Sequence, residues 1–399
     1  MYNISDKQNG KSDAETKGRI PIRPPCLIPA HNTTDTQQEM KGTPVMIKWF
    51  RRIPAAVTAL LITALIPLQA LAADGAPRKA LPVSAGIQAL RDQFEPFQGS
   101  KADRHALDSM YYSPVGENDR TKYPLVIFLH GIGHGKKPGS QLNDSDFPYW
   151  SCSEFQARFS DAGGAFILMP RCPENKHIFW GESLIGSLRA LIVEFIAANK
   201  ENIDTSRVAI SGSSAGGAMV WLMLESFPGM FSCAFPLAST TTPKESSVEK
   251  AHETAIWILA SKKDPAVNYN TSTLKTWNDI LETNDRPEDC RLTTFMTVYK
   301  PDGTKSSDNH HLASVITYDL HTLDEGLYPE AETVDGLGNT VDLRSPNGLI
   351  SWISSVKTNG KGASDVEDAP RLTFLALVKS FMRNRLFAVV HFFQAMLGL

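Results

Sequence analysis

The stretch that most constrains the fold of this chain is Val-Ala-Ile-Ser-Gly-Ser-Ser-Ala-Gly-Gly, residues 208–217. It predicts a short buried strand that runs into a Gly-x-Ser-x-Gly turn and then into a helix. Such a sharp strand-to-helix turn exposes the serine hydroxyl, but it crowds the backbone, so the positions two before and two after the serine must lack bulk. Gly212 and Gly216 occupy those positions, which makes Ser214 the candidate nucleophile. The alternative is an ordinary Gly/Ser turn, and the flanking strand and helix favour the first interpretation.

Composition excludes few classes of protein. The chain has 399 residues, of which 42% are apolar and 21% are charged, with a net charge of −3. These values are typical of a globular protein with ample length for a large core. The near-neutral charge, and the absence of a basic stripe interleaved with aromatic residues, give no indication of a nucleic-acid partner.

The N-terminal region predicts export. Residues 1–45 are polar and turn-rich, and we interpret them as an extension from an upstream start, with Met46 as the true start. Residues 46–72 have a basic beginning, an apolar middle and an Ala-x-Ala exit, the three parts of a secretory signal peptide. The alternative is a membrane anchor, since the apolar run is almost long enough to span a bilayer. We therefore expect a periplasmic or extracellular protein.

Export predicts an oxidising environment for the cysteines. Cys26 lies upstream of the signal, which leaves Cys152, Cys172, Cys233 and Cys290. An even number permits two disulfides, and Cys152 with Cys172 is the pairing we expect first. The alternative is that some of them are buried thiols. Because no Cys-x-x-Cys is present, redox catalysis and a zinc knuckle are both disfavoured.

From about residue 84 the pattern alternates between strands and helices. This alternation predicts one α/β domain over residues 73–356, with a mostly parallel sheet covered by helices on both faces. The expected strands are 111–115, 125–129, 165–169, 208–210, 234–237, 255–259 and 291–298, and the expected helices are 183–199, 217–225, 272–282 and 349–356.

Three segments lie outside that alternation. Residues 319–346 are acidic and contain several glycines, which predicts an insertion or flap. Residues 357–370 are polar and predict a linker. Residues 371–399 are apolar but carry basic residues, so they are predicted to form a helix that lies on a membrane surface or packs on the domain or a partner subunit.

A serine nucleophile needs a base, an orienting acid and an oxyanion hole, which in a parallel sheet come from loops at the carboxyl ends of strands. Directly after the strand 125–129 comes a glycine-rich turn, His-Gly-Ile-Gly-His-Gly, residues 130–135. We expect the N–H groups of Ile132 and Ala215 to form the oxyanion hole, with Gly131 shaping the loop. A phosphate-binding loop is the alternative, but the required glycine spacing and Gly-Lys-Ser/Thr are missing.

The acid and base are predicted from the next strand ends. Asp264 follows the strand 255–259 and is the expected acid, although an Asp-Pro turn would also explain it. His310 and His311 follow the last strand, and one of them is the expected general base. A metal site of Asp308, both histidines and His321 is disfavoured, because no known ligand spacing is present.

Together these motifs resemble the α/β-hydrolase superfamily, in particular the secreted esterases grouped with polyhydroxybutyrate depolymerases and feruloyl esterases, and the related prolyl-oligopeptidase-like domains. The resemblance covers roughly residues 110–320. It rests on the segments 124–131, 169–173 with Trp180 downstream, 204–217 and 263–265.

The resemblance implies several roles. In such relatives the catalytic histidine is followed seven residues later by a tyrosine, and counting back from Tyr318 favours His311 over His310 as the base. Trp180 and His130 are expected to bind substrate, and no metal or cofactor is expected. The chain departs from the relatives at Ser213 and Ala215, where they often carry a larger residue, and the turn after the histidine lacks a tryptophan. These departures leave the specificity open.

The expected function is therefore a secreted serine hydrolase that cleaves a small-molecule or polymeric carboxylic ester through an acyl-enzyme. One alternative is a peptidase of the prolyl-oligopeptidase-like type. The other is a non-catalytic binding protein on a hydrolase scaffold, since a fold alone does not establish activity.

Overall fold

The computed structural model describes residues 76–99, 106–144, 147–159, 161–174, 179–296, 310–311, 331–343, 348–358 and 363. The predicted extension 1–45, signal peptide 46–72 and C-terminal helix 371–399 lie outside these residues, and so does most of the predicted linker 357–370. Over the described ranges, no helix combines the length and apolar character that crossing a membrane requires.

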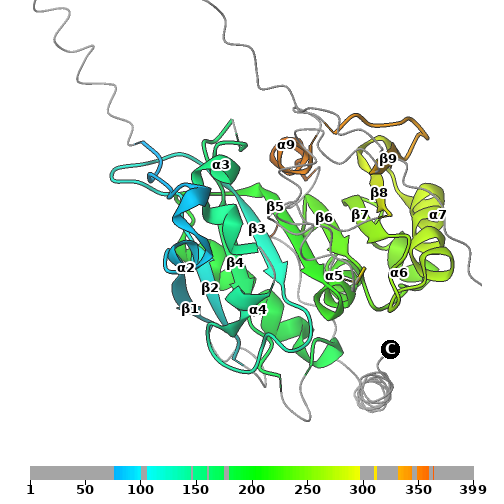
Figure 1. The fold of residues 1–399 in the computed structure, drawn as a ribbon, viewed down its shortest axis with the longest axis horizontal. Coiled ribbons are helices and arrows are strands. Elements are labelled where there is room, and N and C mark those ends of the chain that lie inside the picture. The colour runs from blue at the N-terminus through cyan, green and yellow to red at the C-terminus, as the bar shows by residue number, and fades with distance from the viewer. Residues whose placement is uncertain are drawn as a thin grey trace, which may run out of the picture. The chain divides into compact units, whose positions relative to one another are not determined.

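The strands among the described residues form one nine-stranded sheet (Figure 1). Its strands are β1 (Glu95–Gln98), β2 (Asp108–Tyr112), β3 (Tyr123–Leu129), β4 (Phe166–Pro170), β5 (Ile203–Ser213), β6 (Cys233–Leu237), β7 (Ala255–Ser261), β8 (Arg291–Phe295) and β9 (Glu332–Asp335). They are ordered β1-β2-β4-β3-β5-β6-β7-β8-β9. The pairs from β4 to β8 are parallel, whereas β1, β2 and β9 pair antiparallel at the two edges.

Helices connect the strands and cover the sheet. The α-helices are α2 (Ile87–Arg91), α3 (Ser153–Gln156), α4 (Ile185–Ala198), α5 (Ala215–Ser226), α6 (Glu245–Glu249), α7 (Leu274–Thr283) and α9 (Leu349–Ser355). The short turns are η2 (Val83–Ala85), η3 (Ser140–Asn143), η4 (Phe147–Ser151), η5 (Glu182–Leu184), η7 (Pro287–Asp289) and the π-helical η6 (Tyr269–Thr273).

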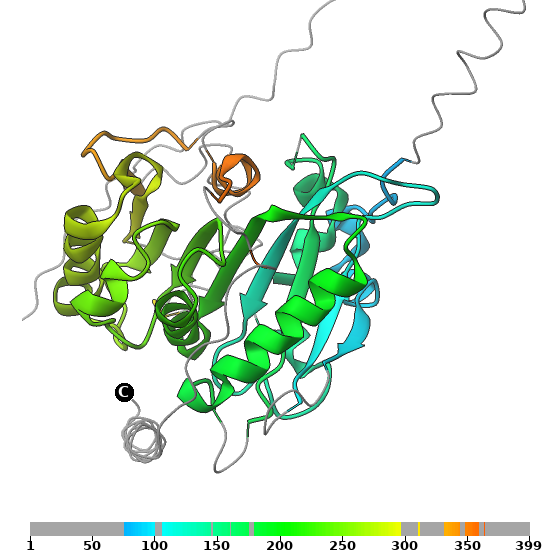
Figure 2. The same ribbon diagram turned by 180° about the vertical axis from the view of Figure 1, so that it is seen from behind.

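The parallel centre of the sheet explains the sequence pattern. All seven residues of β3 are buried, and successive side chains face opposite sides. Leu125 and Ile127 join the core beneath α4, α5, α6 and α7, whereas Val126 and Phe128 join the core beneath α2, α3 and α9. Figure 2 shows α4 lying across the first of these faces. A strand covered on both faces reads as a continuous apolar run, which is why β3 was predictable.

The predicted alternation is confirmed for the central elements, with shifted ends. The second strand lies at Asp108–Tyr112 rather than at 111–115, and β5 is much longer than the predicted 208–210. The edge strand β1 was not predicted, because three of its four residues are exposed and it lacks an apolar pattern.

Part of the predicted insertion or flap, residues 319–346, forms an edge strand of the sheet. Residues Glu332–Asp335 form β9, which pairs antiparallel with β8 at the edge of the sheet. Thr293 and Thr333 lie opposite each other, with 2.8 Å between their Oγ1 atoms, and Lys262 pairs with Glu332 at 2.7 Å. A four-residue strand inside an acidic stretch gives no clear period-2 signal, which explains why this strand was not predicted.

A stack of aromatic rings fixes the segment between β3 and α3. The ring of Phe147 stacks on Phe128 of β3 with centroids 3.8 Å apart. The ring of Trp150 stacks on both Phe147 and Phe235 of β6, at 4.9 Å and 5.8 Å. All four side chains are fully buried. The turn η4 is therefore attached to two central strands of the sheet.

The predicted disulfide between Cys152 and Cys172 is wrong. Cys152, Cys172, Cys233 and Cys290 are all free and buried. Cys152 packs in the core on the Val126 face of the sheet, whereas Cys172 packs in the core on the opposite face. The sheet lies between them, so nearness in the sequence does not bring the two sulfur atoms together.

We predict that the four buried thiols are unreactive in the native protein that begins at Ala73. Burial raises the pKa of Cys152, Cys233 and Cys290 to about 12 and that of Cys172 higher still, so thiolate is scarce at neutral pH. A thiol reagent should label them slowly in buffer and completely in denaturant without reductant. A thermal midpoint that falls when reductant is added, or fewer than four thiols in denaturant, would indicate a disulfide instead.

Candidate active site

Ser214 lies on a strained turn between β5 and α5. Its backbone has φ 54° and ψ −112°, a positive-φ conformation that non-glycine residues rarely adopt. The Ser214 N–H donates to the carbonyl of Leu237 at 3.0 Å, which ties the turn to the end of β6. Backbone strain of this kind costs about 1–3 kcal/mol and persists only where surrounding structure enforces it.

Two glycines make that turn possible. A Cβ on Gly212 would lie 2.5 Å from the carbonyl carbon of Gly216, and a Cβ on Gly216 would lie 1.9 Å from the carbonyl oxygen of Leu129. Both contacts are with backbone that cannot move aside. The first turn of α5 therefore sits directly on the end of β3, and only glycine fits at either position.

Three predicted side chains meet at the carboxyl end of the sheet. His311 Nε2 lies 2.9 Å from Ser214 Oγ, and His311 Nδ1 lies 2.8 Å from Asp264 Oδ2. The Asp264 side chain is only 1% exposed, whereas that of His311 is 20% exposed. Ser214 is half-buried. The three groups thus form a continuous hydrogen-bonded chain that reaches the surface at its serine and histidine.

The contacts of Asp264 set the orientation of the imidazole. Its Oδ1 accepts hydrogen bonds from the N–H groups of Ala266 at 2.7 Å and Val267 at 3.0 Å. Its Oδ2 is left to accept from His311 Nδ1–H. In that tautomer Nε2 carries a lone pair and accepts the hydroxyl proton of Ser214.

The second histidine has a different partner. His310 Nδ1 lies 3.4 Å from Ser261 Oγ, at the end of β7. Of the two neighbouring histidines, the structure therefore brings His311 and not His310 to Ser214. Asp308, His321 and Tyr318 lie outside the described residues.

The loop after β3 lies against the serine turn. A Cβ on Gly131 would lie 3.3 Å from Ser213 Oγ and 3.6 Å from Ser214 Cβ. The Gly131 N–H donates to Asp144 Oδ2 at 2.6 Å, and the Gly133 N–H donates to Glu174 at 2.8 and 3.0 Å. Between them, the N–H of Ile132 has no acceptor among the described residues.

The serine side of the predicted oxyanion hole is the first turn of α5. Ala215 is the first residue of that helix, so its N–H has no partner four residues earlier within the helix. The two N–H groups predicted for the hole, those of Ile132 and Ala215, thus belong to two segments that touch at Gly131.

The sheet order, the strand-turn-helix around Ser214 and a family match all indicate the same fold. Residues 189–257, which run from α4 to β7 and include Ser214, match the model of the prolyl oligopeptidase family. The fold is that of an α/β-hydrolase. The family match and this fold together support a serine hydrolase.

Solved structures of similar fold include esterases and peptidases. A thermostable esterase is 23% identical, with 61% of this chain and 64% of that chain covered and a TM-score of 0.47. The acylaminoacyl peptidase of Pyrococcus horikoshii is 15% identical, with 58% of this chain and 41% of that chain covered and a TM-score of 0.40. Est1E from Butyrivibrio proteoclasticus is 14% identical, with 57% of this chain and 95% of that chain covered and a TM-score of 0.36. The chain spans less than two thirds of the first two, and no curated protein sequence matches it.

The structure gives His130 and Trp180, the residues predicted to bind substrate, contacts that support the loop after β3. His130 is fully buried, and its Nε2 accepts from the N–H of Cys172 at 3.0 Å while Nδ1–H donates to Gly131 O at 2.7 Å. Burial lowers the pKa of His130 to about 4, so the imidazole is neutral at pH 7. Trp180 is 8% exposed, and its indole N–H donates to His130 O at 2.8 Å. Both residues support the loop from below.

Sequence reasoning missed two carboxylates that hold the same loop. Asp144 and Glu174 accept from the N–H groups of Gly131 and Gly133, and their side chains are 4% and 7% exposed. Burial raises the pKa of Glu174. Both residues lie in polar stretches that read as surface loops, so composition alone gave no signal for them.

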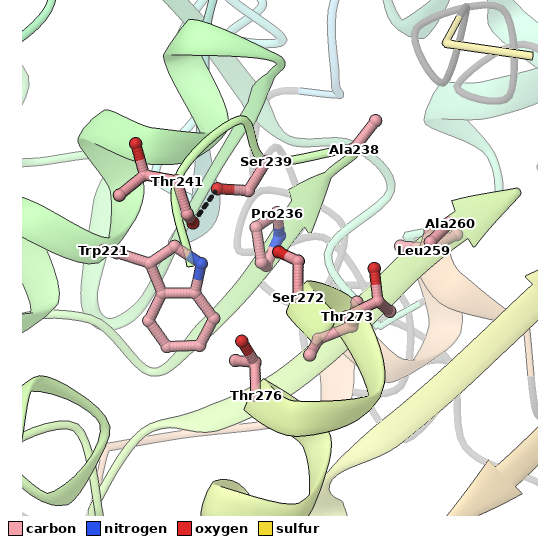
Figure 3. Close-up of a pocket in the computed structure, with 11 residues that line it drawn as sticks. Trp221, Pro236, Ala238, Ser239, Thr241, Leu259, Ala260, Ser272, Thr273 and Thr276 are labelled. Carbon is pink, nitrogen blue, oxygen red and sulfur yellow. Dashed lines mark hydrogen bonds between the residues drawn. The ribbon is translucent and has the colours of Figure 1, made fainter. Parts of the chain in front are cut away.

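A small pocket is lined by residues of α5, β6, β7, the loop after β6, η6 and α7 (Figure 3). Its walls carry the hydroxyl groups of Ser239, Thr241, Ser272, Thr273 and Thr276 and the indole of Trp221. The loop that forms one wall also touches the nucleophile, since the Thr240 N–H donates to the carbonyl of Ser214 at 3.3 Å. Ala238, at the start of that loop, has a positive φ of 42°. The turn of Ser214 is thus supported by strained backbone on this side as well.

We predict that Gly216→Ala abolishes the site while Gly338→Ala does not. The first variant places its Cβ against the Leu129 carbonyl, whereas the second has no atom within 4 Å and adds only the cost of its φ of 83°, about 1 kcal/mol. Urea unfolding should show a loss of several kcal/mol, or no folding, for Gly216→Ala. Equal losses in the two variants would contradict the close approach of α5 to β3.

Proposed function

We propose that this chain is a serine hydrolase that cleaves carboxylic esters through an acyl-enzyme on Ser214, His311 and Asp264. The observation that carries the proposal is the hydrogen-bonded chain from Ser214 Oγ through His311 to Asp264 Oδ2, with distances of 2.9 and 2.8 Å. This arrangement gives a serine hydroxyl a base within reach, and gives that base a fixed orientation.

The proposed reaction has two halves. Ser214 Oγ attacks the ester carbonyl carbon as its proton passes to His311 Nε2, and the carbonyl oxygen becomes an oxyanion that accepts from the N–H groups of Ile132 and Ala215. The intermediate collapses to the acyl-enzyme, and the alcohol leaves with the proton from His311. Water then attacks the acyl carbon in the same way, which frees the acid and restores Ser214.

The surroundings of Asp264 suit its proposed part. Its carboxylate is almost fully buried, yet two backbone N–H groups and the imidazole satisfy it. A charge held in this way stabilises the imidazolium that forms during attack, and it needs little reorganisation when that charge appears.

A peptidase is the second candidate, and the match of residues 189–257 to the prolyl oligopeptidase family favours it. The same three side chains can form an acyl-enzyme from an amide substrate. In that case protonation of the leaving nitrogen by His311 becomes the demanding step. The motifs that resemble secreted esterases favour the ester, and so we place it first.

We expect fluorophosphonate labelling of the protein that begins at Ala73 to occur at Ser214, together with turnover of short p-nitrophenyl esters. Ser214→Ala should abolish labelling and lower kcat by about 10⁴-fold or more, because the nucleophile is removed. Ser211→Ala, a serine on the same strand that bonds to Phe235 O, is the matched control and should keep both. Folded protein that neither labels nor turns over any substrate would favour a binding protein instead.

The same preparation separates the two enzyme candidates. A p-nitrophenyl ester and a p-nitroanilide with the same acyl group differ only in the leaving atom. An esterase should show kcat/KM at least about 10³-fold higher for the ester, about 4 kcal/mol of activation free energy. Comparable values for the two would favour the peptidase.

We also propose that the protein is exported and that residues 46–72 are removed. The basic, apolar and Ala-x-Ala order of that segment supports this proposal. N-terminal sequencing of the mature protein from an expressing bacterial host should begin at or near Ala73. A mature chain that retains residues 53–68 would favour a membrane anchor.

A further inference from the structure

A buried carboxylate lies between the two segments that meet at Ser214. Asp144 Oδ2 accepts from the Gly131 N–H at 2.6 Å and from the Ser213 hydroxyl at 3.0 Å. Asp144 and Ser213 are 3% and 5% exposed. One oxygen atom therefore links the loop after β3 to the last residue of β5, and neither bond belongs to the proposed reaction itself.

Both partners of Asp144 are next to groups that the proposed reaction uses. Gly131 precedes Ile132, whose N–H would face the oxyanion, and Ser213 precedes Ser214 and Ala215. Fixing the Gly131 amide and the Ser213 side chain on one atom limits how far these two segments can move apart.

Asp144 is itself held by the core. It follows η3 and lies three residues before Phe147, whose ring stacks on Phe128 of β3. With Trp150 stacked on Phe235 of β6, the chain on its C-terminal side is attached to the same strands that carry the loop and flank the serine. The carboxylate is thus supported by the sheet.

We propose that Asp144 is a positioning residue that sets the geometry of the oxyanion hole by joining the Gly131 loop to the Ser214 turn. The inference rests on the proposed function. It also explains the small residue at position 213, because the hydroxyl of Ser213 reaches Asp144 while its Oγ lies only 3.3 Å from where a Cβ of Gly131 would be.

The size of the effect follows from how catalysis depends on geometry. Removing one oxyanion donor costs about 10²- to 10³-fold in kcat, and a displacement of about 1 Å can cost 10²-fold. Loosening the hole without removing a donor should cost less, roughly 10- to 100-fold for Asp144→Ala. Asp144→Asn keeps an amide oxygen that can accept both bonds without the charge, so it should recover part of that loss.

Asp119, at the opposite end of β3 from the Gly131 loop, offers a matched control. Asp119 is 7% exposed and, like Asp144, accepts from a backbone N–H, that of Thr121 at 2.8 Å, and from a hydroxyl, that of Tyr123. It precedes β3, whereas Asp144 contacts the loop that follows β3. Asp119→Ala therefore removes a comparable network far from the serine.

The experiment measures kcat, KM, the rate of fluorophosphonate inactivation and urea unfolding for Asp144→Ala, Asp144→Asn, Ser213→Ala, the double variant Ser213→Ala/Asp144→Ala, and Asp119→Ala. We expect kcat and the inactivation rate to fall together in Asp144→Ala with KM within about 2-fold, because a transition-state interaction is lost. Ser213→Ala should lose less, and the double variant no more than Asp144→Ala alone, because Ser213 acts through Asp144. Asp119→Ala should lose stability but keep kcat.

Several outcomes would overturn the inference. They are a kcat for Asp144→Ala within about 2-fold of the unaltered chain, a rise in KM at constant kcat, or an equal loss of kcat in Asp119→Ala. Should Asp144→Ala fail to fold, Asp144→Asn and Ser213→Ala carry the same comparison. Failure of the proposed function is distinguishable, because the unaltered chain would then show neither labelling at Ser214 nor turnover.

Discussion

The close approach of α5 to the end of β3 is the constraint on which the site depends. Gly216 lies so near the Leu129 carbonyl that a single added carbon would overlap it. This contact forces the chain to turn within one residue, and Ser214 takes the positive φ that the turn requires. The strain is local, and the rigid parallel strands on either side enforce it. Exposure of the serine hydroxyl is therefore a consequence of backbone packing.

The rest of the site is held in place in two ways, by strand ends and by hydrogen bonds to carboxylates. Strand ends place the side chains, since Ser214 comes directly after β5 and Asp264 is the third residue after β7. The loop after β3 has no such support, and its glycines give it many conformations. Two carboxylates hold it instead: Asp144 accepts from the buried amide of Gly131, which would otherwise lack a partner, and Glu174 accepts from the amide of Gly133. The loop is ordered by the hydrogen-bonding needs of its own backbone.

This division explains what the sequence could predict. The strands at the centre of the sheet were identified from apolar runs, Ser214 from the glycine spacing, and Asp264 from chain order. The residues alone left His310 and His311 open, and only the family resemblance favoured His311. The partners of Asp144 lie 13 and 69 residues away in the sequence, so no local pattern reveals its burial. His130 read as a polar residue on an exposed loop, but Trp180 and the amide of Cys172 enclose it. Likewise, β9 depends on a distant partner strand.

The pattern of occupied amides around Ile132 gives the proposed oxyanion hole a physical basis. The Gly131 and Gly133 N–H groups are held by two carboxylates, and this restricts the peptide planes before and after the one that carries the Ile132 N–H, so that N–H has limited freedom to rotate. A donor fixed before the reaction loses no free energy to reorganisation when negative charge develops on the substrate oxygen. The buried carboxylates thus convert a flexible glycine loop into a fixed dipole, while the glycines still allow the backbone to approach Ser214 closely.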